Sequence, residues 1–241
     1  MEELTRMIIE SDLLIEKEAH YELNPAYEKG FDLAIPSTLQ DSLIARLDNL
    51  SSSRAIAQIG AVLGREFSFD LLQAVAKKEE TALQQDLAQL VAAELLYQKG
   101  YGTNATYIFK HALIQDTAYE TLLRSRRQQL HQQVVTVLEQ RFPELVETQP
   151  ELLAHHLTQA GLKEKALLMW EKAGNKAMEQ NTSASAVHHF QKAIALLPSI
   201  TDETARLKKE LAVLAVYHQA LMALKGWGIP RLNKSLIGYF N

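Results

Sequence analysis

The chain has 241 residues, of which 47% are hydrophobic and 22% charged, as is typical of a globular protein with a buried core. Its formal net charge of −4 gives no overall attraction for nucleic acid or anionic lipid, and the lack of cysteine excludes disulfides, thiolate catalysis and cysteine-ligated zinc. No apolar run approaches a membrane span, and the acidic N-terminus lacks the charge pattern of a signal peptide. We therefore expect a soluble, cytoplasmic protein.

The first 35 residues predict a helix followed by two short strands. Apolar residues recur at helical spacing from Leu4 to Ile15, with no capping residue ahead of them, which favours a fragment of something longer. The stretch LLIEKEAHYELN predicts two strands around a polar turn. Pro25 and Pro36 then mark a linker.

Residues 36–123 predict a winged-helix domain that begins with helices. These helices are expected over residues 37–50, 53–63, 69–76 and 81–94. Capping boxes are expected at two of the helix starts, Ser37 with Gln40 and Thr81 with Gln84. Ser68 fits an N-cap, and Gly64 fits a left-handed C-cap.

Two strand patterns complete the winged helix. The stretches LLYQKGY and ATYIFKH flank good turn formers at residues 102–104 and so predict a β-hairpin. His111 stands where the second strand gives way to a helix. A catalytic base, a DNA-reading residue and a switch contact are all conceivable at this position.

Residues 124–241 predict an α-helical region without strands. Its first helix has a buried stripe and should end before Pro143, the stripe being Leu130, Val134, Leu138 and Phe142. Pro150 opens the next helical stretch, and residues 201–225 form the last.

Residues 167–200 match a tetratricopeptide repeat at six signature positions. These positions are Trp170, Gly174, Ala186, Phe190, Ala193 and Pro198. Small residues at 174 and 186 allow two helices to pack closely, so we expect Trp170 and Phe190 to be core residues in contact across one helical hairpin. One repeat cannot bury its own apolar face, and neighbouring helices are therefore required.

The sequence contains no motif of a free-standing enzyme. It has neither a phosphate-binding loop nor the glycine fingerprint of dinucleotide-binding proteins. The adjacent pairs His155–His156 and His188–His189 invite a metal interpretation, but neighbours on a helix point about 100° apart and do not chelate as a pair. Histidines on a helix surface or in packing contacts are the alternative. We expect no catalytic residue, no metal site and no cofactor in this chain.

Four blocks of sequence resemble one group of large bacterial signalling proteins. The blocks are IPSTLQDSLIARLDNL, AQIGAVLGREFSFDLL, FKHALIQDTAYETLLRSRRQQLH and ETQPELLAHHLTQAG. In these proteins a class III adenylate/guanylate cyclase domain is often joined to an AAA-type ATPase of the STAND group and a tetratricopeptide tail. The resemblance implies that residues 1–35 end the nucleotide-binding module, that 36–123 are its winged helix and that 124–241 begin the repeat arm.

The resemblance also implies a role for the chain. It would be a regulatory segment whose winged helix senses nucleotide state and whose repeats bind a protein partner or the ATPase itself. ATP or ADP and Mg²⁺ would be cofactors of the full-length protein, bound by residues that precede Met1. In the STAND group a winged-helix histidine after an apolar strand contacts the β-phosphate of ADP, and His111 resembles that residue. The alternatives are a winged helix that serves only as a packing scaffold and a histidine that caps its helix or packs beside Tyr119.

The main alternative function is a DNA-binding transcriptional regulator with a helical-repeat effector arm. Winged helices often read DNA through a basic recognition helix, here expected over residues 81–94. That stretch contains no lysine or arginine, and Glu79 and Glu80 offset the two lysines before it. Nucleic acid and membrane are therefore not expected partners. The arginines at 124, 126 and 127 are interaction candidates for an acidic neighbour, or else a solvated helix face.

Overall fold

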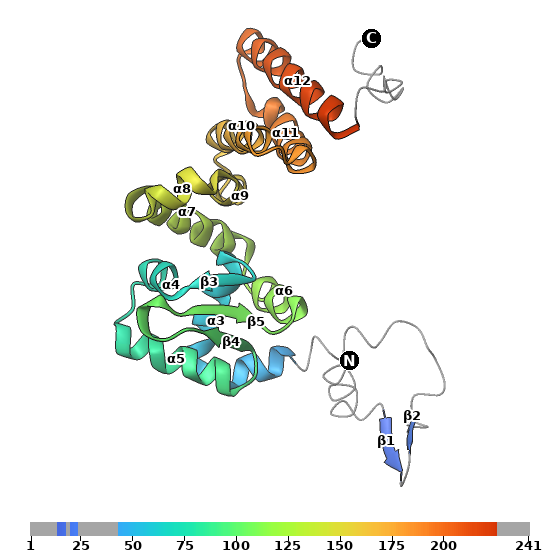
Figure 1. Ribbon diagram of the computed structural model, residues 1–241. Coiled ribbons are helices and arrows are strands. Elements are labelled where there is room, and N and C mark those ends of the chain that lie inside the picture. The colour runs from blue at the N-terminus through green and yellow to red at the C-terminus, as the bar shows by residue number, and fades with distance from the viewer. Residues whose placement is uncertain (1–13, 18–19, 24–42, 226–241) are drawn as a thin grey trace. The chain divides into compact units, whose positions relative to one another are not determined.

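The computed structural model describes residues 14–17, 20–23 and 43–225 (Figure 1). These residues are mainly α-helical, with a three-stranded antiparallel sheet and one separate strand pair. The predicted fold class is thus confirmed. The chain divides into two compact units between Arg126 and Arg127.

The strand pair near the N-terminus matches the prediction. Strands β1 (Leu14–Lys17) and β2 (His20–Leu23) run antiparallel, with Leu14 opposite Leu23 and Lys17 opposite His20. Leu14 and Ile15, which the helical pattern also included, therefore lie in a strand. The rest of the predicted first helix, the linker and the Ser37–Gln40 box lie outside the described residues.

The first unit continues as a winged helix. After a helical stretch over residues 43–49, its elements are α3 (Ser51–Leu63), β3 (Glu66–Ser68), α4 (Phe69–Ala76), α5 (Glu80–Ala92), β4 (Leu96–Lys99), the 3₁₀ turn η2 (Gly102–Asn104), β5 (Thr106–Phe109) and α6 (Ala112–Glu120). The sheet order is β3-β5-β4, so the last strand in sequence is the central one. The hairpin β4–β5 is the predicted wing, and helices α3, α4 and α5 precede it (Figure 1).

Strand β3 was not predicted, because its three residues are too few for a strand pattern. Phe67 pairs with Tyr107 on β5, and their rings stack with centroids 6.1 Å apart. The Phe67 ring also lies against Gly60 of α3, where a Cβ atom would stand 2.7 Å from it. Ser68 ends the strand and also caps α4 as predicted, since its Oγ accepts a hydrogen bond from the Leu71 amide at 3.2 Å.

Two other predicted caps need correction. Gly64 follows α3 with φ 136° and ψ −170°, so it uses a positive φ but is not left-handed helical. The predicted box of Thr81 with Gln84 is wrong, because α5 begins at Glu80 with Glu79 before it. The Gln84 amide instead donates to the Glu80 carboxylate one turn earlier, at 3.1 Å.

The second unit consists of helices in its described residues, as predicted. They are α7 (Arg124–Arg141, which begins just before the unit boundary), α8 (Pro143–Thr148), α9 (Pro150–Gln159), α10 (Lys163–Glu179), α11 (Ser183–Leu196), the 3₁₀ turn η3 (Leu197–Ser199) and α12 (Glu203–Lys225). Helices α9 to α12 pack in succession, each on the next (Figure 1). Of the predicted stripe on α7, Leu130, Val134 and Leu138 are buried.

Close packing of α10 on α11 depends on one glycine and one phenylalanine. Phe190 is fully buried, and a Cβ atom on Gly174 would lie 2.4 Å from its ring. Ala186 and Ala193 are also fully buried on α11, whereas Pro198 is exposed in η3. The ring of Phe190 therefore occupies the space that the missing side chain leaves free.

Trp170 is buried in a neighbouring part of the same packing. Its indole N–H donates to the Thr158 hydroxyl of α9 at 3.0 Å, and its ring stacks on His189 with centroids 5.5 Å apart. The expected burial of Trp170 and Phe190 is confirmed, while direct contact between them stays a prediction. Within the described parts of the chain, no helix is long and apolar enough to cross a bilayer.

We expect Phe190→Ala to lower the free energy of unfolding by about 3–5 kcal/mol, because a fully buried ring leaves a cavity. Gly174→Ala should cost about 1–3 kcal/mol, since the added methyl group overpacks the same contact. The double variant should lose less than the sum of the two. Denaturant unfolding measures all three, with exposed Asn175→Ala as the control. Unchanged stability of Phe190→Ala would mean that the proposed packing register is wrong.

Candidate functional site

His111 lies at the seam between strand β5 and helix α6. It is the N-cap residue of α6, with extended backbone angles of φ −133° and ψ 148°, and its side chain is exposed. Its carbonyl accepts hydrogen bonds from the Ile114 and Gln115 amides, but its imidazole does not cap the helix. The alternative that the His111 side chain caps its helix is therefore wrong. Contact of His111 with a nucleotide stays a prediction.

The three arginines begin helix α7. Arg124 and Arg126 are exposed and Arg127 is half-buried, and the first turn of the helix has no acidic residue. Cations at a helix N-terminus oppose the helix dipole, at a cost of about 0.3–1 kcal/mol each at the surface. The role of these arginines as interaction candidates stays a prediction.

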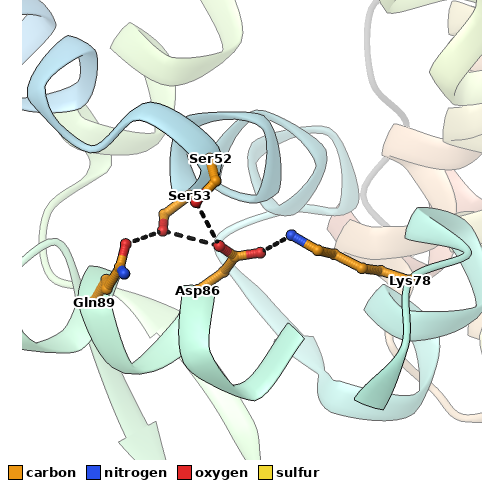
Figure 2. Close-up of polar contacts among 5 residues, drawn as sticks. All are labelled: Ser52, Ser53, Lys78, Asp86 and Gln89. Carbon is orange, nitrogen blue, oxygen red and sulfur yellow. Dashed lines mark hydrogen bonds and ion pairs between the residues drawn. The ribbon is translucent and has the colours of Figure 1, made fainter. Parts of the chain in front are cut away.

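Helix α5 occupies the position of a recognition helix, and its one acidic side chain past the first turn faces inward. Figure 2 shows the Asp86 carboxylate between α3, α5 and the segment before α5. It accepts hydrogen bonds from the hydroxyls of Ser52 at 3.0 Å and Ser53 at 3.2 Å, and it forms an ion pair with Lys78. Asp86 is 4% exposed and Ser53 fully buried, so this network holds α5 against α3.

The network also determines what the surface of α5 offers to a partner. The charge of Lys78, the last lysine before the helix, is already paired with the Asp86 carboxylate. The exposed side chains of the helix are neutral after its first residue, being Thr81, Gln84, Gln85, Ala88, Gln89 and Ala92. Phosphate contacts supply most of the affinity for DNA, and this surface has no cation to make them.

A groove of about 610 Å³ lies on the second unit, over α8, α10 and α12. Its lining residues are Glu147, Leu168, Glu171, Lys172, Asn175, Lys176, Glu179 and Lys209. Three carboxylates and three ammonium groups thus share it, and two ion pairs cross it, Lys172–Glu147 and Lys209–Glu171, each at 2.6 Å. Leu168 is half-exposed among them. Such a surface can hold a polypeptide segment with charges of both signs.

Three histidines meet inside the second unit. His131 comes from α7, and His155 and His156 come from α9. The Nδ1 atoms of His131 and His156 are 2.8 Å apart, a hydrogen bond in which one ring must be the donor. One ring nitrogen from each of the three lies within 4.8 Å of those of the other two. His131 and His156 are buried, whereas His155 is exposed.

The surroundings keep these rings neutral. Burial lowers the pKa of His131 to about 4, and His155 adds a smaller repulsion. Burial likewise lowers the pKa of His156 to about 2, helped by the other two histidines. Although His155 is exposed by surface area, the protein atoms around its ring lower its pKa too, and the charge of Lys192 adds to the effect.

The sequence indicated two of the three histidines in this cluster. The geometric argument against an adjacent pair is correct for the pair alone, but His131 lies 25 positions earlier in the chain and joins it from another helix. A usable signal was present, because His131 is one turn before Val135 on the buried face of α7. The other pair differs, since His188 is exposed and His189 packs on Trp170.

Comparison with models of known protein families gives no match. The chain is 29% identical over 200 residues to an uncharacterized protein of Rhizobium meliloti. The matched stretch covers 80% of the chain and 18% of that protein, so the chain spans less than a fifth of the length of this relative.

We expect Asp86→Ala to lower the free energy of unfolding by about 1–3 kcal/mol, because it removes the acceptor of the Ser52 hydroxyl and of the Lys78 ammonium group, while the Ser53 hydroxyl keeps Gln89 as an acceptor. Asp116→Ala, at an exposed position of α6, is the matched control and should change stability little. Thermal or denaturant unfolding measures both. Equal stability of the two variants would show that the network does not hold α5.

Proposed function

We propose that this chain is a non-catalytic regulatory and interaction segment of a cytoplasmic signalling ATPase of the STAND type, linked to cyclic-nucleotide signalling. The winged helix senses the nucleotide state of an ATPase module, and the helical hairpins of the second unit bind a polypeptide partner or another part of the same protein. ATP or ADP and Mg²⁺ belong to the ATPase module. The length of the Rhizobium meliloti relative supports a role within a much larger protein.

One observation carries this proposal, namely the pairing of two kinds of unit in one chain. The chain combines a winged helix whose α5 surface is neutral after its first residue with a succession of helices that has a groove of mixed charge. A neutral α5 surface suits protein contacts better than contacts with phosphate. The groove gives the second unit a place where an extended segment can form hydrogen bonds and ion pairs.

His111 is the residue through which the winged helix would respond to a nucleotide. It is exposed at a helix N-terminus, where backbone N–H groups and the helix dipole favour an anion. An imidazole at this place can donate a hydrogen bond to a phosphate oxygen. A contact of this kind would hold the closed, ADP-bound state of the ATPase module.

We expect His111→Ala to weaken ADP binding about tenfold or more in a protein that joins this chain to its ATPase module, because a hydrogen bond to a charged group contributes about 1.5–3 kcal/mol. Basal output should rise at the same time, and the isolated chain should not hydrolyse ATP. Calorimetric ADP titration and an activity assay measure these effects, with the exposed His218→Ala variant as control. Unchanged ADP affinity together with unchanged output would reduce His111 to a structural residue.

The alternative function, a DNA-binding regulator, is tested by a fluorescence anisotropy titration with duplex DNA at physiological salt. We expect no binding below the micromolar range, because α5 exposes no lysine or arginine. Submicromolar binding that weakens with salt would favour the DNA-binding function instead. In that case, Arg124→Ala and Arg126→Ala would show whether the affinity comes from α7.

A further inference from the structure

We propose that His131, His155 and His156 form a binding site for a divalent transition-metal ion of the zinc, nickel and copper group, with a fourth coordination position open to solvent. This site goes beyond the proposed regulatory function and does not depend on it. Three imidazoles with no carboxylate among them suit these ions, whereas Mg²⁺ and Ca²⁺ prefer oxygen ligands.

The spacing of the rings carries the proposal. Their centroids are 5.1 Å apart for His131 and His156, 5.3 Å for His155 and His156, and 5.7 Å for His131 and His155. For a tetrahedral ion with Zn–N bonds of about 2.0–2.1 Å and a ring radius of about 1.2 Å, the centroids of ligating imidazoles lie about 5.2 Å apart. The three rings therefore already form a triangle of nearly the required size.

The hydrogen bond between His131 and His156 would be exchanged for coordination. Two nitrogens bound to one tetrahedral ion lie about 3.3 Å apart, so the present 2.8 Å contact has to open by about half an ångström. The proton between the two Nδ1 atoms then moves to the Nε2 of its own ring, and both rings stay neutral. The three ring nitrogens now lie within 4.8 Å of one another, so the more widely separated ones have to close toward about 3.3 Å by side-chain rotation.

The burial of the site explains what an ion would add. His156 is fully buried, and the bond between its Nδ1 and that of His131 is its one side-chain hydrogen bond, since its Nε2 has no partner. Coordination at Nδ1 would replace this hydrogen bond with a stronger metal–nitrogen bond, while Nε2 would stay without a partner. His155 is exposed, so it provides an entry path and room for a water ligand.

An ion bound here would join α7 to α9. The His131–His156 contact and a hydrogen bond from the Gln128 amide to the Ala160 carbonyl, at 3.0 Å, connect the two helices at this place. Metal binding would add a further and stronger connection. The second unit should then become more resistant to unfolding when the ion is present.

The test uses the whole chain, freed of metal with a chelator and then titrated with Zn²⁺ and with Co²⁺. We expect saturable binding of one ion per chain, a rise in Tm of a few degrees at saturation, and visible absorption of Co²⁺ typical of tetrahedral nitrogen ligation. His155→Ala should weaken binding at least tenfold and should lower the Tm of the metal-free protein less than His131→Gln does, because His155 is exposed and His131 is buried. His188→Ala, from the other adjacent pair, is the matched control and should bind as the parent does.

Two results would overturn the proposal. One is the absence of saturable binding of either ion. The other is binding of the same strength in the parent, in His155→Ala and in His131→Gln, which would place the ion elsewhere on the chain. If His131→Gln does not fold, the exposed His155→Ala variant alone decides between these outcomes.

Discussion

In the second unit, a hydrogen bond between two buried imidazoles constrains how α7 meets α9. His131 and His156 are both buried, and the third ring of the cluster, that of His155, lies beside them. At the two facing Nδ1 atoms, one ring has to donate the hydrogen bond and the other ring has to accept it. A shift of α7 along α9 would leave both nitrogens buried without a partner, at a cost of about 1–3 kcal/mol for each. This contact selects one packing of helices whose apolar side chains alone would tolerate several.

The features that could be predicted from the sequence are those set by neighbouring residues. Helix α4 has the predicted bounds because Ser68 caps it, and the wing follows from two strand patterns around Gly102. Strand β3 escaped prediction because only its distant partner β5 makes its three residues a strand. The histidine cluster escaped for the same reason, since a third ring from α7 completes it. The capping box at Thr81 failed because Glu80 already begins the helix.

The winged helix uses its polar groups to fix its own structure. The contact between α3 and α5 is stabilised by Asp86, Lys78 and the two serines (Figure 2). In addition, the Arg46 side chain donates a hydrogen bond to the Ala93 carbonyl at the end of α5, at 2.8 Å. Buried networks of this kind are directional and favour one arrangement of helices. These contacts fix α5 on α3, while the exposed side chains of α5 after its first residue are neutral.

The strand order of the winged helix has a consequence for how the protein is made. β5 lies between β3 and β4, yet it is the last of the three to leave the ribosome. Until residues 106–109 emerge, β3 and β4 have no strand to pair with, and the Phe67 ring lacks Tyr107 and Phe109 as neighbours. Domains fold as units during synthesis, so we expect the helices of this unit to complete their packing only after strand β5 has been synthesised. A nascent chain stopped before Thr106 would expose two unpaired strand edges and be prone to aggregate.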